Sequence, residues 1–365
     1  MVTLEDVARA ANVSISTVSR VLNGSSLVAE ETRKRVQQAI EALGYQPSRV
    51  ARRLRRERRP ANLIGLIIPD IQNPFFADLA RGVEDVAQQH GYMVFLGNSD
   101  EDAAKEKLYL DLMRAESVDG LILPPNAERD AAASELARSG LPMVCVDRRL
   151  AKVTVDTVVV DNVRGAYEAV EHLIRLGHRR IGFIEGRPEL STSKERLEGY
   201  RKALKDYGTE PDPALVRQGD SRQASGRRLT LELLESPDPP TALFVGNNLM
   251  TLGALEAIHS LGLRIPEDIA IVGYDDMPWA LAFNPPLTAV RQPGYEVGRR
   301  AMELLLQRIR EPKRSTTLVL LQPELIVRES CGAGLKARRR CRARKAASPA
   351  RDRSSGEVSG RRRGS

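Results

Sequence analysis

The sequence has few of the residues that build disulfide frameworks, metal sites or membrane spans. Its 365 residues include three cysteines and four histidines, and the spacings of Cys145, Cys331 and Cys341 match no metal-ligand pattern. No apolar stretch approaches the roughly 20 residues of a membrane span. The first residues, MVTLEDVARAA, carry acidic side chains where an export signal needs a positive region and an apolar run. The sequence therefore predicts a soluble cytoplasmic protein with no membrane contact, no metal and no cofactor.

Catalytic and nucleotide-binding motifs are also missing. We find no GxGxxG, P-loop or GxSxG pattern, and the four histidines, at positions 90, 172, 178 and 259, are dispersed along the chain. The sequence thus predicts a protein that is not an enzyme.

Positive charge is concentrated at the two ends of the chain. Residues 1–60 carry 12 basic and 6 acidic side chains, residues 336–365 carry 12 and 2, and the stretch between carries 32 and 40. The formal net charge of +8 therefore comes from two basic ends on an acidic middle. This asymmetry predicts an anionic partner, nucleic acid, for at least one end.

The first 46 residues are predicted to form three helices. Thr3 is a candidate N-cap for the first helix and Ser14 for the second, and Glu30 to Leu43 fit a third that ends at Gly44. Apolar spacing predicts these inward positions on the second and third helices: Val18, Val21, Leu22, Val36, Ile40 and Leu43. A domain of this size buries little, so we expect its exposed faces to carry its function.

The exposed face of the second helix carries Ile15, Ser16, Thr17, Ser19 and Arg20. Such a face fits the major groove of DNA, where arginine donates a bidentate pair to guanine and hydroxyl or methyl groups contact other base edges. It also fits the solvated surface of another small helical domain. Composition alone leaves both interpretations open.

The residue order of this segment carries a resemblance. VTLEDVARAANVSISTVSRVLNG and the following VAEETRKRVQQAIEALGYQPSRVARRL resemble, nearly throughout, the DNA-binding headpiece of the LacI/GalR family of bacterial transcription regulators. The resemblance implies a helix-turn-helix domain over residues 1–46. It also implies base contacts by Ile15, Ser16 and Arg20, and phosphate contacts by Thr3, Ser14, Thr17 and Asn23.

Residues 47–60 contain the arginine-rich segment SRVARRLRRERRP. Val50 and Leu54 stand at i and i+4, but a helix of one or two turns is too short to be stable alone in water. The resemblance implies the family's hinge helix, ordered on DNA, in which Leu54 enters a central base step beside Ala51 while arginines such as Arg55 neutralise phosphates. A charged linker with an incidental leucine is the alternative.

From residue 61 to 330 short apolar runs alternate with amphipathic helical stretches. The runs are LIGLII (63–68), YMVFLG (92–97), GLIL (120–123), PMVCV (142–146), TVVV (157–160), RIGFI (180–184), TALFV (241–245) and IAIVG (269–273). Strands that alternate with helices predict βαβ units and parallel sheets covered on both faces. Because this length exceeds one doubly wound sheet, we expect two subdomains with a ligand cleft outside the carboxyl ends of their strands.

Carboxylates, amides, an arginine and two phenylalanines follow these runs, a set that suits a polyhydroxylated ring. Phrases such as IGLIIPDIQNPFFADLARGVE and GLRIPEDIAIVGYDD resemble the family's effector-binding core, which is related to periplasmic sugar-binding proteins. The resemblance implies these effector contacts: Asn73, Phe75, Phe76, Asp147, Arg148, Arg196, Asn247 and Asp275. Taken singly, either phenylalanine fits a core position equally well, and an aspartate after a strand can simply cap the next helix.

Two positions depart from the family pattern. Asn248 stands where relatives usually have aspartate, and Ser221 stands where several have an aromatic residue after Gly-Asp. Without an aromatic lid, a sugar or sugar derivative is favoured over a purine.

The predicted fold is an all-α helix-turn-helix headpiece followed by an α/β core of two doubly wound parallel-sheet subdomains, like periplasmic binding proteins. The predicted function is a transcriptional repressor that binds a palindromic double-stranded DNA operator as a homodimer and responds to a sugar in its core. The alternatives are a corepressed regulator with a non-sugar effector such as a nucleobase, and a sugar-binding protein without a DNA role.

Residues 331–365 lie beyond the resemblance. They are rich in arginine, alanine, glycine and serine with almost no large apolar side chains, so we expect a disordered basic tail. Nonspecific DNA binding and a solvated extension with little role are both compatible with this composition.

Overall fold

The computed structural model describes residues 2–22, 25, 27–45 and 61–334. Two compact units make up the chain, residues 1–60 and residues 61–365. Four predicted DNA contacts, Asn23, Ala51, Leu54 and Arg55, lie outside the described residues, as do the expected hinge and the tail beyond Gly334.

The described part of the first unit contains three helices, α1 (Leu4–Ala10), α2 (Ile15–Leu22) and α3 (Glu30–Leu43). A capping box opens α1: Thr3 Oγ1 accepts from the Asp6 amide at 3.3 Å, and the Asp6 carboxylate accepts from the Thr3 amide at 2.8 Å. Gly44, with φ of 60°, ends α3 in the left-handed conformation. The predicted helices and their end signals are confirmed.

A small apolar core joins these helices. One fully buried valine comes from each of them: Val7, Val18 and Val36. Leu43, which the spacing places in this core, is instead 37% exposed, so that prediction is wrong. The reason is the left-handed turn at Gly44, which redirects the chain so that Tyr45, 6% exposed, joins the core after it.

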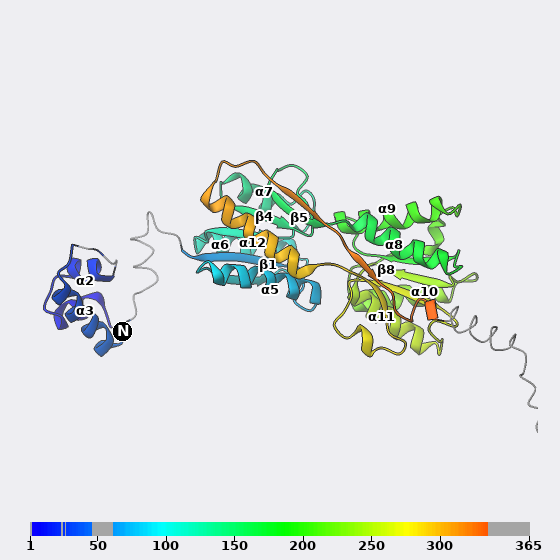
Figure 1. Ribbon diagram of the computed structural model, residues 1–365, viewed down its shortest axis with the longest axis horizontal. Helices are drawn as coiled ribbons and strands as arrows, with labels where there is room; N and C mark the ends of the chain where they lie inside the picture. The colour runs from blue at the N-terminus through cyan, green and yellow to red at the C-terminus, as the bar shows by residue number, and fades with distance from the viewer. Residues whose placement is uncertain (1, 23–24, 26, 46–60, 335–365) are drawn as a thin grey trace, which may run out of the picture. The chain divides into compact units, whose positions relative to one another are not determined.

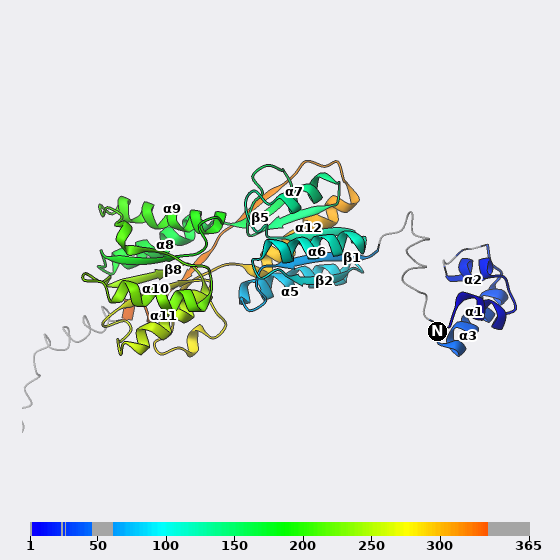
Figure 2. The same ribbon diagram turned by 180° about the vertical axis from the view of Figure 1, so that it is seen from behind.

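Two six-stranded sheets form the second unit, and they lie in the two lobes seen in Figures 1 and 2. The N-subdomain sheet has the order β11-β5-β4-β3-β1-β2, and the C-subdomain sheet has the order β12-β10-β9-β8-β6-β7. Neighbouring strands pair in parallel except for β10 and β12, which are antiparallel. The expected pair of doubly wound subdomains is confirmed, with one antiparallel edge strand in addition.

The N-subdomain consists of β1 (Leu63–Ile68), α5 (Pro74–Gln89), β2 (Met93–Asn98), α6 (Ala103–Ala115), β3 (Gly120–Leu123), α7 (Ala131–Arg138), β4 (Met143–Val146), β5 (Asp156–Val160), α12 (Gly294–Arg310) and β11 (Leu318–Leu321). The C-subdomain consists of α8 (Asn162–Arg175), β6 (Ile181–Glu185), α9 (Ser191–Asp206), the 3-10 turn η1 (Pro213–Leu215), β7 (Val216–Gln218), α10 (Gln223–Leu234), β8 (Ala242–Val245), α11 (Asn248–Ser260), β9 (Ala270–Tyr274), the 3-10 turn η2 (Ala280–Ala282), β10 (Thr288–Arg291) and β12 (Glu324–Ile326). Among the helices that the structure describes, none has the length and apolar character needed to cross a bilayer.

Each predicted apolar run falls on a strand. The strands that sequence reasoning missed, β7, β10, β11 and β12, have three or four residues and lie at or next to a sheet edge. Their burial is mixed, as in the alternation of exposed and half-buried residues along β11. Short strands of this kind lack the continuous apolar run that marks a buried parallel strand.

The chain crosses between the subdomains after β5, after β10 and after β11. In Figure 1 the orange segment that follows α12 runs from the N-subdomain to the C-subdomain. Within the N-subdomain, α12 packs closely on α5. A Cβ at Gly298 would lie 2.0 Å from the carbonyl oxygen of Leu79, so only glycine allows this approach of the two helices.

The packed core of the C-subdomain reaches beyond residue 330, where the basic tail was expected to begin. Cys331 is fully buried, and its Sγ lies 3.2 Å from His172 Nε2 and 3.2 Å from Thr288 Oγ1. The side chain of Cys331 is therefore part of the fold.

Candidate DNA-contact and effector sites

The α2 helix presents several predicted DNA contacts on one face. Ile15 is 45% exposed, and Ser16 and Arg20 are exposed as well. Val18 and Val21 are buried on the opposite face. The helix therefore offers one aliphatic, one hydroxyl and one guanidinium group to the outside, as the spacing predicted.

Hydroxyl groups cluster at the start of α2. Ser14 Oγ accepts from the Thr17 amide at 3.2 Å and lies 2.8 Å from Ser16 Oγ and 2.9 Å from Thr17 Oγ1. Thr3, in contrast, already donates its hydroxyl and its amide to Asp6, at 2.7 and 2.8 Å. These two bonds hold the pKa of Asp6 below its usual value.

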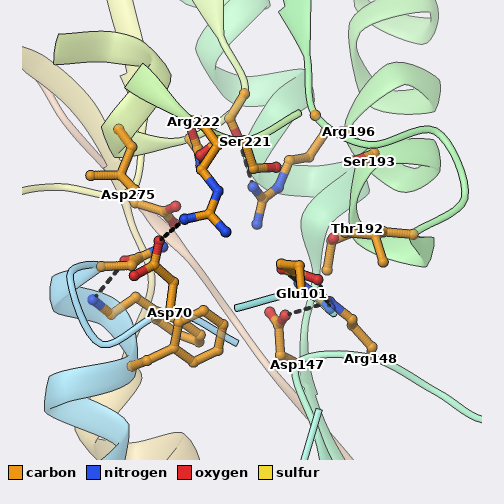
Figure 3. A pocket seen from close by; sticks show the side chains of 18 of the residues that line it. Asp70, Glu101, Asp147, Arg148, Thr192, Ser193, Arg196, Ser221, Arg222 and Asp275 are labelled. Atoms are coloured by element: carbon orange, nitrogen blue, oxygen red, sulfur yellow. Dashed lines mark hydrogen bonds and ion pairs between the residues drawn. The ribbon is translucent and has the colours of Figure 1, made fainter. Parts of the chain in front are cut away.

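A cavity that is partly open to solvent lies between the sheets of the two subdomains (Figure 3). Its walls are the segments that follow the carboxyl ends of strands in both sheets, as expected for this topology. All eight predicted effector residues line it: Asn73, Phe75, Phe76, Asp147, Arg148, Arg196, Asn247 and Asp275. The structure thus brings residues more than 200 positions apart to one site.

Left-handed backbone conformations gather at the strand ends around this cavity. Asp147 has φ of 62°, Ser221 of 68° and Asp275 of 69°, and Asp100 and Glu101 have φ of 55° and 59°. Non-glycine residues adopt such values rarely, because the Cβ is crowded there. Strain of this kind tends to collect at functional sites, where the surrounding fold holds a side chain in one orientation.

Asp147 and Arg148 form a buried charged group with Glu101. Arg148 donates to Glu101 from Nη2 at 2.6 Å and from Nη1 at 3.0 Å, and its Nε lies 3.2 Å from Asp147 Oδ2. Both nitrogens of the guanidinium tip are therefore already engaged. Burial raises the pKa of Asp147 to about 6, although Arg148 and Arg196 act in the opposite direction.

Arg196 is held from three sides. Its Nε donates to Asn162 at 2.9 Å, its Nη1 donates to the Gly246 carbonyl at 2.6 Å, and its guanidinium carbon lies 3.7 Å from the centre of the Tyr274 ring. Figure 3 shows the tip of the side chain pointing into the cavity. The arginine is therefore pre-oriented toward a ligand.

Asp275 and Asn247 come from the C-subdomain. Asp275 is 5% exposed and accepts from Gln292 Nε2 at 2.5 Å, and burial raises its pKa. Asn247 caps α11 by accepting from the Met250 amide at 2.8 Å, and it donates to the Ser221 carbonyl at 2.9 Å. Because both ends of its amide are engaged, Asn247 shapes the wall of the cavity.

Asn73, Phe75 and Phe76 form the N-subdomain side of the cavity at the start of α5. Asn73 caps this helix through the Phe75 amide at 3.0 Å. The two phenylalanine rings pack edge to face with centroids 5.0 Å apart. They belong both to the apolar core of the N-subdomain and to the cavity wall, so a core position and a place at the effector site are compatible for both residues.

The cavity carries more negative than positive charge. Its lining includes five carboxylates, Asp70, Glu101, Asp147, Asp220 and Asp275, and three arginines, Arg148, Arg196 and Arg222. A neutral ligand with many hydroxyl groups suits this lining better than an anion. In the described part of the chain, no group of three or more His, Cys, Asp or Glu side chains is arranged to hold a metal ion.

Two family models match the chain. Residues 3–48 match the family model of bacterial regulatory proteins of the lacI family. Residues 61–329 match the family model of periplasmic binding proteins and the sugar binding domain of the LacI family. The chain belongs to the LacI family. It is a DNA-binding transcriptional regulator with an effector-binding domain.

Relatives match along almost their whole length. The chain is 38% identical over 331 residues to the HTH-type transcriptional repressor PurR of Aliivibrio salmonicida (strain LFI1238), a match that covers 90% of this chain and 99% of that repressor. The structure of the transcriptional regulator CelR in complex with cellobiose matches with a TM-score of 0.69 and 35% identity, covering 90% of this chain and 100% of that one. The lac repressor dimer bound to operator and the anti-inducer ONPF matches with a TM-score of 0.76 and 31% identity, covering 90% and 99%.

The two departures of this LacI-family protein have structural consequences. Asn248, in place of the usual aspartate, donates from Nδ2 to Asn73 Oδ1 at 2.8 Å, a bond between the subdomains that a carboxylate would not donate. Ser221 and the next residue, Arg222, both line the cavity, and the Arg222 side chain extends across it (Figure 3).

Sequence reasoning missed several residues of the cavity wall, among them Glu101, Arg222 and Gln292. Glu101 and Arg222 stand one and two residues beyond acidic positions that mark strand ends, so a wider window would have found them. Gln292 follows β10, a strand that the sequence did not reveal.

Replacement of Asp147 by asparagine is expected to stabilise the protein at neutral pH. The pKa of this carboxyl is about 6 in the fold, against 3.8 for an unperturbed aspartate. The protonated carboxyl therefore contributes its full stability to the fold below about pH 4, and this stability is lost as the pH rises through 6. Asp147→Asn avoids an ionised buried group and should raise the free energy of unfolding at pH 7.5 by roughly 2 kcal/mol, with the gain shrinking toward pH 4.

Urea denaturation at several pH values measures this effect. The exposed Asp111→Asn, whose carboxylate pairs with Lys107 on the surface, is the control for the removal of a carboxylate. An Asp147→Asn protein less stable than wild type at pH 7.5 would show that its ion pair outweighs the cost of burial.

Proposed function

We propose that this LacI-family protein is a repressor that binds a palindromic operator as a homodimer and responds to a neutral sugar or sugar derivative. The observation that carries the proposal is a pair of buried carboxylates, Asp147 and Asp275, at the same cavity as the pre-oriented guanidinium of Arg196. Carboxylates accept from hydroxyl groups and the guanidinium donates to them. The bound state of CelR, described with cellobiose, supports a sugar for this chain as well.

The effector contacts are Asp147, Arg196 and Asp275, with the Phe75 and Phe76 rings against the sugar face. Arg148 and Asn247 hold this constellation in place, because their own polar atoms are engaged within the wall. No catalytic step is part of the function, and the protein acts in the cytoplasm.

The DNA contacts lie in the headpiece, residues 1–46, and the hinge, residues 47–60. Ile15, Ser16 and Arg20 contact bases, and the remaining predicted contacts are Thr3, Ser14, Thr17, Asn23, Ala51, Leu54 and Arg55. Effector binding in the core, residues 61–330, biases the angle between the subdomains and thereby the separation of the two hinges in the dimer. Ligand binding becomes a change in operator affinity.

An apolar surface of the N-subdomain supports dimerisation. Met93, Phe95 and Leu96 on the edge strand β2, and Leu108 and Leu112 on α6, are exposed, Met93 by 72% and Leu108 by 68%. Gly97 of β2 lies against the Tyr109 ring of α6, so the two elements pack side by side. A second copy of the chain is the partner that removes this area from water.

Replacement of Arg20 by alanine should cost roughly 1–3 kcal/mol of operator affinity, confined to one base pair in each half-site, because a bidentate contact to guanine is lost. Binding to half-site variants of an operator selected from random palindromes, followed by fluorescence anisotropy, measures this. Lys34→Ala on the exposed side of α3 is the control. Unchanged discrimination at every position in Arg20→Ala would contradict the assignment of α2.

Replacement of Arg196 by alanine should weaken effector binding about tenfold to hundredfold, since bonds from a charged donor are lost, while operator binding without effector persists. The effector is first identified by a thermal-shift screen of sugars and sugar phosphates, and calorimetry then gives its affinity. Arg201→Ala, at an exposed position of the same helix, is the control. Normal effector affinity in a folded Arg196→Ala protein would mean that the ligand binds elsewhere.

Replacement of Leu112 by aspartate should convert the dimer to a monomer, because a charge would be buried in the apolar contact. Light scattering after size exclusion measures the mass. Leu318→Asp, 56% exposed on the opposite edge of the same sheet, should remain dimeric. A dimeric Leu112→Asp protein would place the interface on another surface.

A further inference from the structure

Charged side chains join the two subdomains across the mouth of the cavity. Within the described residues the ion pairs that do so are Arg222–Asp70 at 3.5 Å, Arg187–Glu101 at 3.7 Å and Lys194–Glu128 at 3.2 Å. In each pair the cation belongs to the C-subdomain and the carboxylate to the N-subdomain. Each of these pairs thus joins a basic side chain of one subdomain to an acidic side chain of the other.

Arg222 has the central place in this arrangement. It stands at the N-cap of α10 but makes no side-chain cap bond to that helix. Its Nη2 instead donates to the Asp100 carbonyl at 2.9 Å and its Nη1 donates to Asp70 at 3.5 Å, both across the cleft. Figure 3 shows the side chain spanning the cavity above Asp70.

The backbone around Arg222 directs it there. Ser221 has φ of 68°, and the Arg222 amide donates to Asp220 Oδ1 at 2.8 Å. Ser225 Oγ in turn donates to the Arg222 carbonyl at 2.9 Å. The receiving carbonyl belongs to Asp100, which is itself left-handed with φ of 55°. Both ends of the contact are therefore set by turns in the chain and do not depend on a flexible side chain alone.

Arg187 adds a second bridge of the same kind. Its Nη1 donates to the main-chain carbonyl of Glu101 at 3.0 Å. Glu101 and Asp100 are neighbours, so two arginines of the C-subdomain donate hydrogen bonds to the same turn after β2. A main-chain acceptor keeps its position when a carboxylate moves or is protonated.

We propose that Arg222 is a closing residue of the effector cleft, which with Arg187 and Lys194 draws the C-subdomain toward the N-subdomain. An exposed ion pair contributes little alone, and the Arg222 side chain is 42% exposed. Its loss should therefore shift the ratio of closed to open molecules about two- to fivefold. The proposal rests on the proposed function only in naming the cavity an effector site, because closure is measured without a ligand.

The experiment measures the distance between spin labels on the two subdomains of the full-length protein without effector. Labels are attached at Ala103→Cys on α6 and Glu198→Cys on α9, both exposed positions. Cys341 is replaced by serine, and Cys145 and Cys331 are buried. In 50 mM salt, the ratio of long-distance to short-distance molecules should be two- to fivefold higher in Arg222→Ala than in wild type.

Further variants sharpen the outcome. Asp70→Asn should have a smaller effect than Arg222→Ala, because the bond to the Asp100 carbonyl remains, and the double variant should match Arg222→Ala. Salt at 0.5 M should shift the distance distribution of wild type toward that of Arg222→Ala, because the salt screens the charges. Arg228→Ala, which removes an ion pair with Glu232 on the same helix, is the control.

Equal distance distributions for Arg222→Ala and Arg228→Ala in 50 mM salt would overturn the proposal, as would a shorter mean distance in Arg222→Ala. These readouts involve neither operator nor sugar. A failure of the effector or DNA assignments, tested with Arg196→Ala and Arg20→Ala, therefore leaves this result unaffected and is distinguishable from it.

Discussion

The structure depends on the compensation of negative charge that is buried where the two sheets face each other. Asp147 and Arg148 are each 6% exposed, and Glu101 is bound to the same guanidinium by two hydrogen bonds. An ion removed from water costs several kcal/mol unless it is paired with good geometry. One arginine cannot balance two carboxylates, so the remaining compensation comes from across the cleft, from Arg196 and Arg187. Ligand binding, closure of the cleft and stability of the fold therefore depend on the same few charges.

Features with local causes were predictable from the sequence. Helix ends in the headpiece follow from Thr3, Ser14 and Gly44, whose side chains or backbone freedom act within a few residues. The buried parallel strands follow from continuous apolar runs. The eight cavity residues were found because the segments after parallel strands must meet at one edge, and because the family resemblance indicated which of them face the cleft.

Features with long-range causes were not predictable. Leu43 has the right spacing for the core, but the turn after it brings in Tyr45 instead. Nothing near Arg148 in the sequence indicates that Glu101, 47 positions away, occupies its guanidinium. The bond from Arg222 to the Asp100 carbonyl joins residues 122 positions apart and exists only once both subdomains are formed. Charge pairs of this kind have no periodicity, so a sequence pattern does not reveal them.

The crossing of the chain between subdomains also governs how the protein can be assembled during synthesis. The buried face of α5, which includes Leu79 and Val83, packs against α12, and α12 begins only at Gly294. The ribosome makes all of β6 to β10 between these two helices. The N-subdomain is therefore translated first but completed last, and until α12 emerges the part of α5 that contacts it stays uncovered in the nascent chain. A truncation before Gly294 would leave that part of α5 permanently without its partner helix.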